Sequence, residues 1–204
     1  RCKRYFPEVP VILGGVYATL CPVHARKHSG ADYCITGEGE GSVLRIVSEY
    51  FRRTPAVIPD TNKLDSLPYP AFDLLTHHDA LPLLTARGCP GQCPYCASSL
   101  LNCGLRQRDV SRVLDEIEYW KDTYPLQHIA FYDDALLYRP EERGIPLLKG
   151  LLSRKVSCDF HTPNGLHIRG ITPEVAELLF QTGFKTIRLG LETGDEALQC
   201  DVRL

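Results

Sequence analysis

The 204-residue sequence contains no methionine, one tryptophan and no apolar run of the length a membrane span requires. A transmembrane helix needs about 20 consecutive apolar residues. The first five residues are not followed by the apolar stretch of a secretion signal. We therefore expect a cytoplasmic protein without a membrane partner. Because globular proteins ordinarily contain some methionine, we also expect the sequence to be an excerpt with unnatural ends.

The chain also has no excess of charge of either sign. It carries 23 Lys and Arg against 25 Asp and Glu, for a formal net charge of -2 and a pI near 6.4. This balance supplies no overall attraction to phosphate polyanions, and no local basic patch is visible. Nucleic-acid partners are not expected. With 44% hydrophobic and 24% charged residues, the chain has the composition of a soluble globular protein.

Cysteine, by contrast, is abundant and unevenly spread. There are nine cysteines, an odd number, and four of them fall between Cys89 and Cys103. This distribution suits metal ligation in a reducing compartment better than a disulfide framework.

Residues 1–51 have the pattern of alternating strands and helices. Short apolar runs at 10–13 and 32–36 each end in glycine turns and predict buried strands. Helices are predicted at 22–28 and from Ser42, which we expect to cap the second helix. The order β-α-β-α indicates part of an α/β domain with a parallel sheet. Glu38 and Glu40, in the turn between the second strand and helix, are expected to be solvated.

The rest of the chain divides into a linker and a second domain. Residues 52–82 lose periodicity and contain five prolines, which predicts a linker. Over 83–204 we predict helices alternating with four strands, at 83–86, 128–132, 158–162 and 185–189. Thr172 and Pro173 are predicted to cap and start the helix before the fourth strand, and Gly183 to end it. Successive βα units with right-handed crossovers predict part of a parallel, TIM-like barrel.

Polar residues follow each predicted barrel strand, where barrels carry their chemistry. Cysteines follow the first strand, Asp133 and Asp134 the second, Asn164 the third, and Glu192 the fourth. We therefore expect these side chains to share one rim and to form a site.

The segment 87–96 carries the spacing C-x3-C-x2-C in Cys89, Cys93 and Cys96, on a loop containing Gly and Pro. Three thiolates can bind three irons of a [4Fe-4S] cubane and leave the fourth iron open. The motif, its place after a first barrel strand and the aromatic Tyr95 resemble the radical S-adenosylmethionine (radical SAM) superfamily. The alternative is a structural zinc site in a non-catalytic interaction module, with Cys103 as fourth ligand.

The resemblance implies an enzyme in which the open iron binds S-adenosylmethionine (SAM) and the reduced cluster cleaves it to a 5′-deoxyadenosyl radical. It implies that Asp133 or Asp134 accepts hydrogen bonds from the methionine ammonium, although either aspartate can instead cap a helix. Asn164 and Glu192 match positions for the methionine carboxylate and the ribose, but also suit a turn and a surface charge. Tyr95 either lies along the adenine or packs in the core.

Segments 10–20, 30–33 and 37–40 resemble the second half of the cobalamin-binding domain that precedes many radical SAM enzymes. Many such domains bind cobalamin through a D-x-H-x-x-G histidine, and this motif is absent from the sequence. The sequence therefore leaves open whether this segment binds cobalamin. The resemblance further implies an electron donor such as flavodoxin or ferredoxin. The substrate, a small molecule or another class, and the reaction, with methyl transfer and rearrangement among the options, are not determined.

Overall fold

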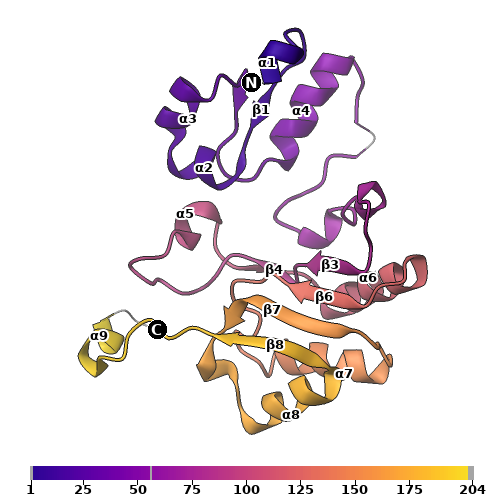
Figure 1. Cartoon of the computed structure of the whole chain (residues 1–204), viewed down its shortest axis with the longest axis vertical. Coiled ribbons are helices and arrows are strands. Elements are labelled where there is room, and N and C mark those ends of the chain that lie inside the picture. Colours follow the sequence, from indigo (N-terminus) through magenta and orange to yellow (C-terminus); the bar gives the residue numbers. More distant parts are fainter. Residues whose placement is uncertain (1, 56, 202–204) are drawn as a thin grey trace.

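The computed structural model describes residues 2–55 and 57–201. It has an N-terminal unit built on two short parallel strands and a larger unit built on a four-stranded parallel sheet (Figure 1). This alternation of helices with parallel strands confirms the predicted α/β class.

The N-terminal unit follows the predicted β-α-β-α order. Strands β1 and β2 pair in parallel, with Ile12 opposite Tyr33 and Leu13 opposite Cys34. The prediction that Ser42 caps the next helix is wrong, since that helix begins at Glu40 and Gly39 holds the cap position. The elements of this unit are α1 (Cys2–Tyr5), β1 (Ile12–Leu13), α2 (Gly15–Leu20), α3 (Pro22–His28), β2 (Tyr33–Cys34) and α4 (Glu40–Phe51).

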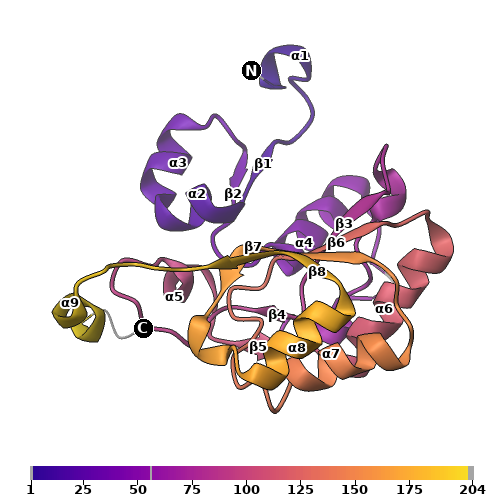
Figure 2. The ribbon, with the colours of Figure 1, turned by 60° about the horizontal axis from the view of Figure 1, so that its bottom comes forward.

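The larger sheet has the order β3-β6-β7-β8, and all of its strands are parallel. Helices α6, α7 and α8 lie on one face of it (Figure 2). The strands are β3 (Ala80–Leu83), β6 (His128–Phe131), β7 (Asp159–Leu166) and β8 (Phe184–Leu189). The helices are α6 (Val110–Thr123), α7 (Gly144–Ser153), α8 (Pro173–Thr182) and α9 (Glu196–Asp201).

Helix α8 shows how local sequence sets these bounds. The Thr172 hydroxyl accepts a hydrogen bond from the Val175 N–H, and Pro173 occupies the first turn. Gly183 ends the helix with a φ of 92°, a conformation that glycine adopts without steric cost. The predicted start and stop of this helix are confirmed.

The first barrel strand lies earlier than predicted, at Ala80–Leu83 instead of 83–86. Its proline, Pro82, is tolerated because β3 is an edge strand and Pro82 needs no N–H on the open side. Residues 52–82 are also more ordered than the prolines suggested. They contain 3₁₀ turns at Leu64–Ser66 and Phe72–Leu74. The Phe72 ring packs against the Trp120 ring, with a centroid separation of 5.0 Å.

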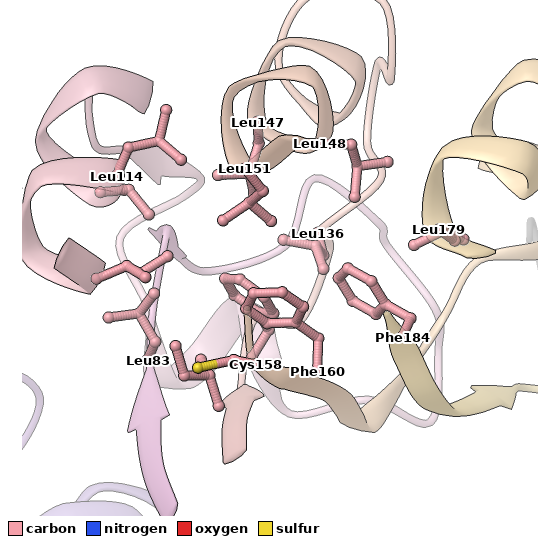
Figure 3. Packing of buried hydrophobic residues seen from close by; sticks show 14 of the residues in the cluster. Leu83, Leu114, Leu136, Leu147, Leu148, Leu151, Cys158, Phe160, Leu179 and Phe184 are labelled. Atoms are coloured by element: carbon pink, nitrogen blue, oxygen red, sulfur yellow. The ribbon is translucent and has the colours of Figure 1, made fainter. Parts of the chain in front are cut away.

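The hydrophobic core lies between the four-stranded sheet and its helices (Figure 3). Phe131, Phe160 and Phe184 come from adjacent strands and stack with centroid separations of 5.3 to 5.8 Å. Leucines of α6, α7 and α8 close over these rings, among them Leu148, which is only 2% exposed. This packing fixes the strands whose carboxyl ends bear the predicted site.

Within the described residues, the structure has no helix that combines the length and apolarity required to cross a bilayer.

Candidate functional site at the cysteine loop

The three motif cysteines lie on one loop that leaves the end of the first barrel strand. A short antiparallel ribbon closes the base of this loop, pairing β4 (Ala86–Arg87) with β5 (Arg106–Gln107). Inside the loop, α5 (Ser98–Leu101) is a single short turn of helix. We call residues 88–105 the cysteine loop.

Two glycines form the neck of the cysteine loop. Gly88 has a φ of +87°, and a Cβ atom there would lie 2.3 Å from the carbonyl oxygen of Gly104. A side chain at position 88 would therefore meet both an unfavourable backbone conformation and a backbone clash. The chain can enter and leave the loop this closely only because position 88 is glycine.

The first two thiols flank a third glycine. A Cβ atom at Gly91 would lie 3.3 Å from Cys89 Sγ and 3.6 Å from Cys93 Sγ, so a larger residue would crowd the space between the sulfurs. The Gly91 N–H donates to Cys89 Sγ at 3.3 Å. The Ser98 N–H donates to Cys96 Sγ at 3.4 Å. Backbone N–H groups thus already point at two sulfurs, as they do around thiolates that bind metal.

Burial raises the pKa of the Cys89 thiol, and Asp134 and the other two cysteines add to the effect. Four potentially anionic groups therefore gather at the loop. Such a set favours a bound cation, which removes the mutual repulsion by binding the thiolates. In the described parts of the chain, no three Cys, His, Asp or Glu side chains converge as the ligands of a single metal ion.

The structure separates Asp133 from Asp134. Asp133 is 2% exposed and accepts hydrogen bonds from both the backbone N–H and the hydroxyl of Thr85, the latter at 2.6 Å. Burial raises the pKa of Asp133 to about 6. Asp134 instead contacts the cysteine loop, where its carboxylate accepts a hydrogen bond at 3.2 Å from the Ser98 hydroxyl. Of the two, Asp134 is the carboxylate that faces the thiols.

Tyr95 and Glu192 meet beside the second thiol. Partial desolvation, together with Cys93 and Glu192, raises the pKa of the Tyr95 hydroxyl to about 12. The side chain of Tyr95 is not core packing, because it is 55% exposed. The cysteine loop thus meets the segment that follows β8, although β3 and β8 lie at opposite edges of the four-stranded sheet.

The sequence suggested that Asn164 follows the third strand. In the structure Asn164 lies within that strand, β7. Its amide donates to the carbonyl oxygen of Tyr132 at 2.7 Å, which ties β7 to the end of β6. The pairing of β7 with β8 shifts register between Thr162 and Leu166, and Gly165 has a φ of +86°. This irregularity, which periodicity does not reveal, places Asn164 at the rim despite the longer strand.

Glu38 and Glu40 are not the solvated turn that the sequence suggested. Their side chains are 20% and 27% exposed, and they form ion pairs with arginines at the base of the cysteine loop. Sequence reasoning did not single out Arg87 and Arg106, nor Thr85. The available signal was that Arg87 and Arg106 flank the cysteine loop in the sequence. Their partners, Glu38 and Glu40, lie far away in the chain.

A largely apolar cavity of about 820 Å³ lies beside this rim. The largest share of its lining comes from residues 59–72, and the rest includes Glu40 and Leu44 of the N-terminal unit, Leu83 and Leu84 at the end of β3, and Tyr132 just after β6. The cavity therefore lies between residues 59–72, the N-terminal unit and the ends of β3 and β6.

A three-cysteine loop at the carboxyl edge of a parallel sheet, with carboxylate and amide groups on neighbouring strand ends, defines a class of metallocluster enzymes. The sequence matches the radical SAM superfamily over residues 83–203, more than half of the chain. The chain belongs to this superfamily.

The chain is also similar to named methyltransferases. It is 26% identical to an uncharacterized methyltransferase of Pyrococcus horikoshii, with 94% of this chain and 47% of that protein covered. It is 24% identical to the hopanoid C-2 methylase of Rhodopseudomonas palustris, with 95% and 39% covered. The chain thus spans less than half the length of these relatives.

Among solved structures, the fold resembles that of TsrM from Kitasatospora setae, a radical S-adenosylmethionine methyltransferase solved with tryptophan and a SAM analogue. The TM-score is 0.73 at 16% identity, with 96% of this chain and 44% of that chain covered. A second structure of TsrM, with cobalamin and a [4Fe-4S] cluster, gives a TM-score of 0.66, also at 16% identity. It covers 93% of this chain and 44% of that chain. The likeness extends across both units of the fold.

Proposed function

We propose that the chain is the cofactor-binding part of a radical SAM methyltransferase. In this proposal Cys89, Cys93 and Cys96 hold a [4Fe-4S] cluster whose remaining iron binds SAM. The observation that carries it is the cysteine loop itself, where Asp134 lies near Cys89 and the space between Cys89 and Cys93 depends on Gly91. Three thiolates on one loop match a cubane with an open corner.

When bound and reduced, such a cluster supplies the electron that breaks a carbon–sulfur bond of SAM. The protein's own residues position the substrate of that step. Asp134 offers a carboxylate to the methionine ammonium, and its bond to Ser98 fixes it to the cysteine loop. Asp133 has a supporting role, because its hydrogen bonds with Thr85 hold the ends of β3 and β6 together.

Asn164, Glu192 and Tyr95 complete the proposed SAM site. Asn164, on β7, can bind the methionine carboxylate, and Glu192 can accept hydrogen bonds from the ribose hydroxyls. The exposed ring of Tyr95, next to Glu192, offers a face on which adenine can stack. Residues 83–204 would thus bind cluster and SAM, with a small-molecule substrate and an external electron donor as partners.

Residues 1–51 are proposed to belong to a cobalamin-binding unit, joined to the barrel through 52–82. Support comes from the open space beside the ends of β1 and β2. A Cβ atom at Gly15 or Gly37 would meet no atom of the described chain within 4 Å, and both glycines have positive φ. A large planar cofactor can approach backbone there, as ligands do at the carboxyl edge of parallel sheets.

The similarity to methyltransferases favours methyl transfer over rearrangement as the reaction class. The rim cavity is large and its lining is mostly apolar. We therefore propose that the methyl acceptor enters this cavity.

The test is anaerobic reconstitution with iron and sulfide, followed by dithionite and SAM. The proposal predicts about four irons per chain and SAM-derived 5′-deoxyadenosine or S-adenosylhomocysteine. Asp134→Asn should raise the KM for SAM with iron content unchanged, and Asp122→Asn, on α6, serves as the matched control. A colourless protein that retains zinc would instead identify the interaction module and refute the proposal.

A further inference from the structure

The base of the cysteine loop carries two arginines on opposite strands of its ribbon. Arg87 and Arg106 are register partners in the β4–β5 pair. Arg87 stands two residues before Cys89 and one before the glycine neck, while Arg106 closes the loop on the other side. Any group that fixes both side chains also fixes the two ends of the loop.

Both arginines are bound by carboxylates of the N-terminal unit. The two terminal nitrogens of Arg106 donate hydrogen bonds to the two carboxylate oxygens of Glu38, and the Nη1–Oε2 distance is 3.0 Å. Arg87 contacts Glu40 at 2.6 Å and Glu38 at 3.5 Å. Arg106 also donates to the carbonyl oxygen of Thr61 at 2.6 Å. Two-point arginine–carboxylate contacts fix orientation as well as distance.

This group is shielded from water. The Arg106 side chain is 13% exposed, against 61–62% for the surface pair Arg139–Glu142. Pairing with Arg106 holds the pKa of Glu38 below its ordinary value, so the pair stays ionised near neutral pH. Shielded pairs are less screened by salt than surface pairs, and breaking one leaves a charge without compensation.

We propose that Glu38, Glu40, Arg87 and Arg106 form a clamp by which the N-terminal unit positions the cluster-binding loop. The proposal rests on the function proposed above and adds positioning residues to it. The clamp fixes both ends of the loop that carries the three thiols. It also neutralises two positive charges that would otherwise stand beside the cluster.

These two consequences can be measured separately. Amide hydrogen exchange of residues 88–105 in the cluster-free protein reports on the loop alone. The midpoint potential of the reconstituted cluster reports on nearby charge, since an uncompensated cation favours the more negative reduced state. A merely structural contact would not shift the potential in a direction set by charge.

In Glu38→Gln we expect several-fold faster exchange in the loop and a more positive midpoint potential. Arg106→Lys keeps the charge but loses the two-point contact, so exchange should rise while the potential moves less. Glu40→Gln, which removes the Arg87–Glu40 ion pair and leaves both arginines in contact with Glu38, is the milder variant if Glu38→Gln does not fold. Glu142→Gln on the exposed pair is the control and should match the wild type.

Wild-type loop exchange in both Glu38→Gln and Arg106→Lys would overturn the clamp. An unchanged potential in Glu38→Gln would overturn its electrostatic part. If the wild-type protein assembles no cluster, the proposed function fails, and exchange in the cluster-free protein still decides whether the clamp positions the loop.

Discussion

The helix-covered face of the sheet and the cysteine loop at its edge are held by different interactions. The core is a continuous set of apolar contacts in which Phe131, Phe160 and Phe184 are at most 8% exposed. The loop has half-buried or exposed thiols and is fixed by glycines, hydrogen bonds and the arginine–glutamate clamp. Stability thus resides in one region and the proposed chemistry in the other.

Because the two regions are held by different interactions, mutations should separate stability from the proposed chemistry. Removing core volume should reduce the free energy of unfolding, because buried contacts are lost throughout the sheet. Removing a thiol should leave the fold intact and remove only the ligand.

Phe160→Ala should have the largest effect. The ring is fully buried between its two stacked neighbours, so its loss should cost about 3–5 kcal/mol in the free energy of unfolding, measured by urea denaturation. Phe180→Ala on α8, where the ring is 81% exposed, is the control and should change it by less than about 0.5 kcal/mol. Equal losses in the two variants would contradict the assigned core.

Asp133→Asn should change how stability depends on pH. Burial raises the folded-state pKa of Asp133 from 3.8 to about 6, so the folded protein binds this proton more tightly than the unfolded chain. The stabilisation from this proton is present below pH 4 and is lost as the pH rises through 6. Relative to wild type, the variant should gain about 2–3 kcal/mol between pH 3.5 and 7. Parallel stability curves for the two proteins would argue against the raised pKa.

Gly88→Ala should strain the neck of the cysteine loop. The new Cβ would clash with the Gly104 carbonyl at a positive φ, so we expect a loss of about 1–3 kcal/mol together with reduced iron content. Gly194→Ala is the control, because it has open space and no positive φ. Full iron loading of Gly88→Ala would show that the close neck is not needed.

Cys93→Ala should have the smallest effect on folding and the most complete effect on the cluster. The cluster-free variant should unfold within about 0.5 kcal/mol of the cluster-free wild type, because the thiol is only half-buried. Its [4Fe-4S] content and SAM cleavage should both be abolished. Cys21→Ser, at an exposed cysteine outside the motif, should retain both.

The sequence predicted the elements whose pattern is local. Strands β6 and β8 were placed to within about a residue, and Thr172 and Gly183 marked the ends of α8. The start of β3 was missed because Pro82 resembles a linker residue, and only its edge position in the sheet makes a proline acceptable there.

The candidate site shows the same division. The cysteine spacing is local and can be read directly from the sequence, and Tyr95 and Glu192, which follow the first and fourth strands, do meet. The different environments of Asp133 and Asp134 depend on Thr85, 48 residues away from Asp133. The partners of Glu38 and Glu40 also lie in distant sequence, so hydrophobic periodicity could not reveal the clamp.

Ligation of a [4Fe-4S] cluster by three cysteines, with one iron open to SAM, can be tested by electron paramagnetic resonance of the anaerobically reconstituted, dithionite-reduced protein, recorded without and with SAM. A reduced [4Fe-4S] cluster with one free iron should give a signal whose g values change when SAM is added. A protein that gives no iron–sulfur signal after full reconstitution, or a signal that SAM leaves unchanged, would contradict three-cysteine ligation with an open iron.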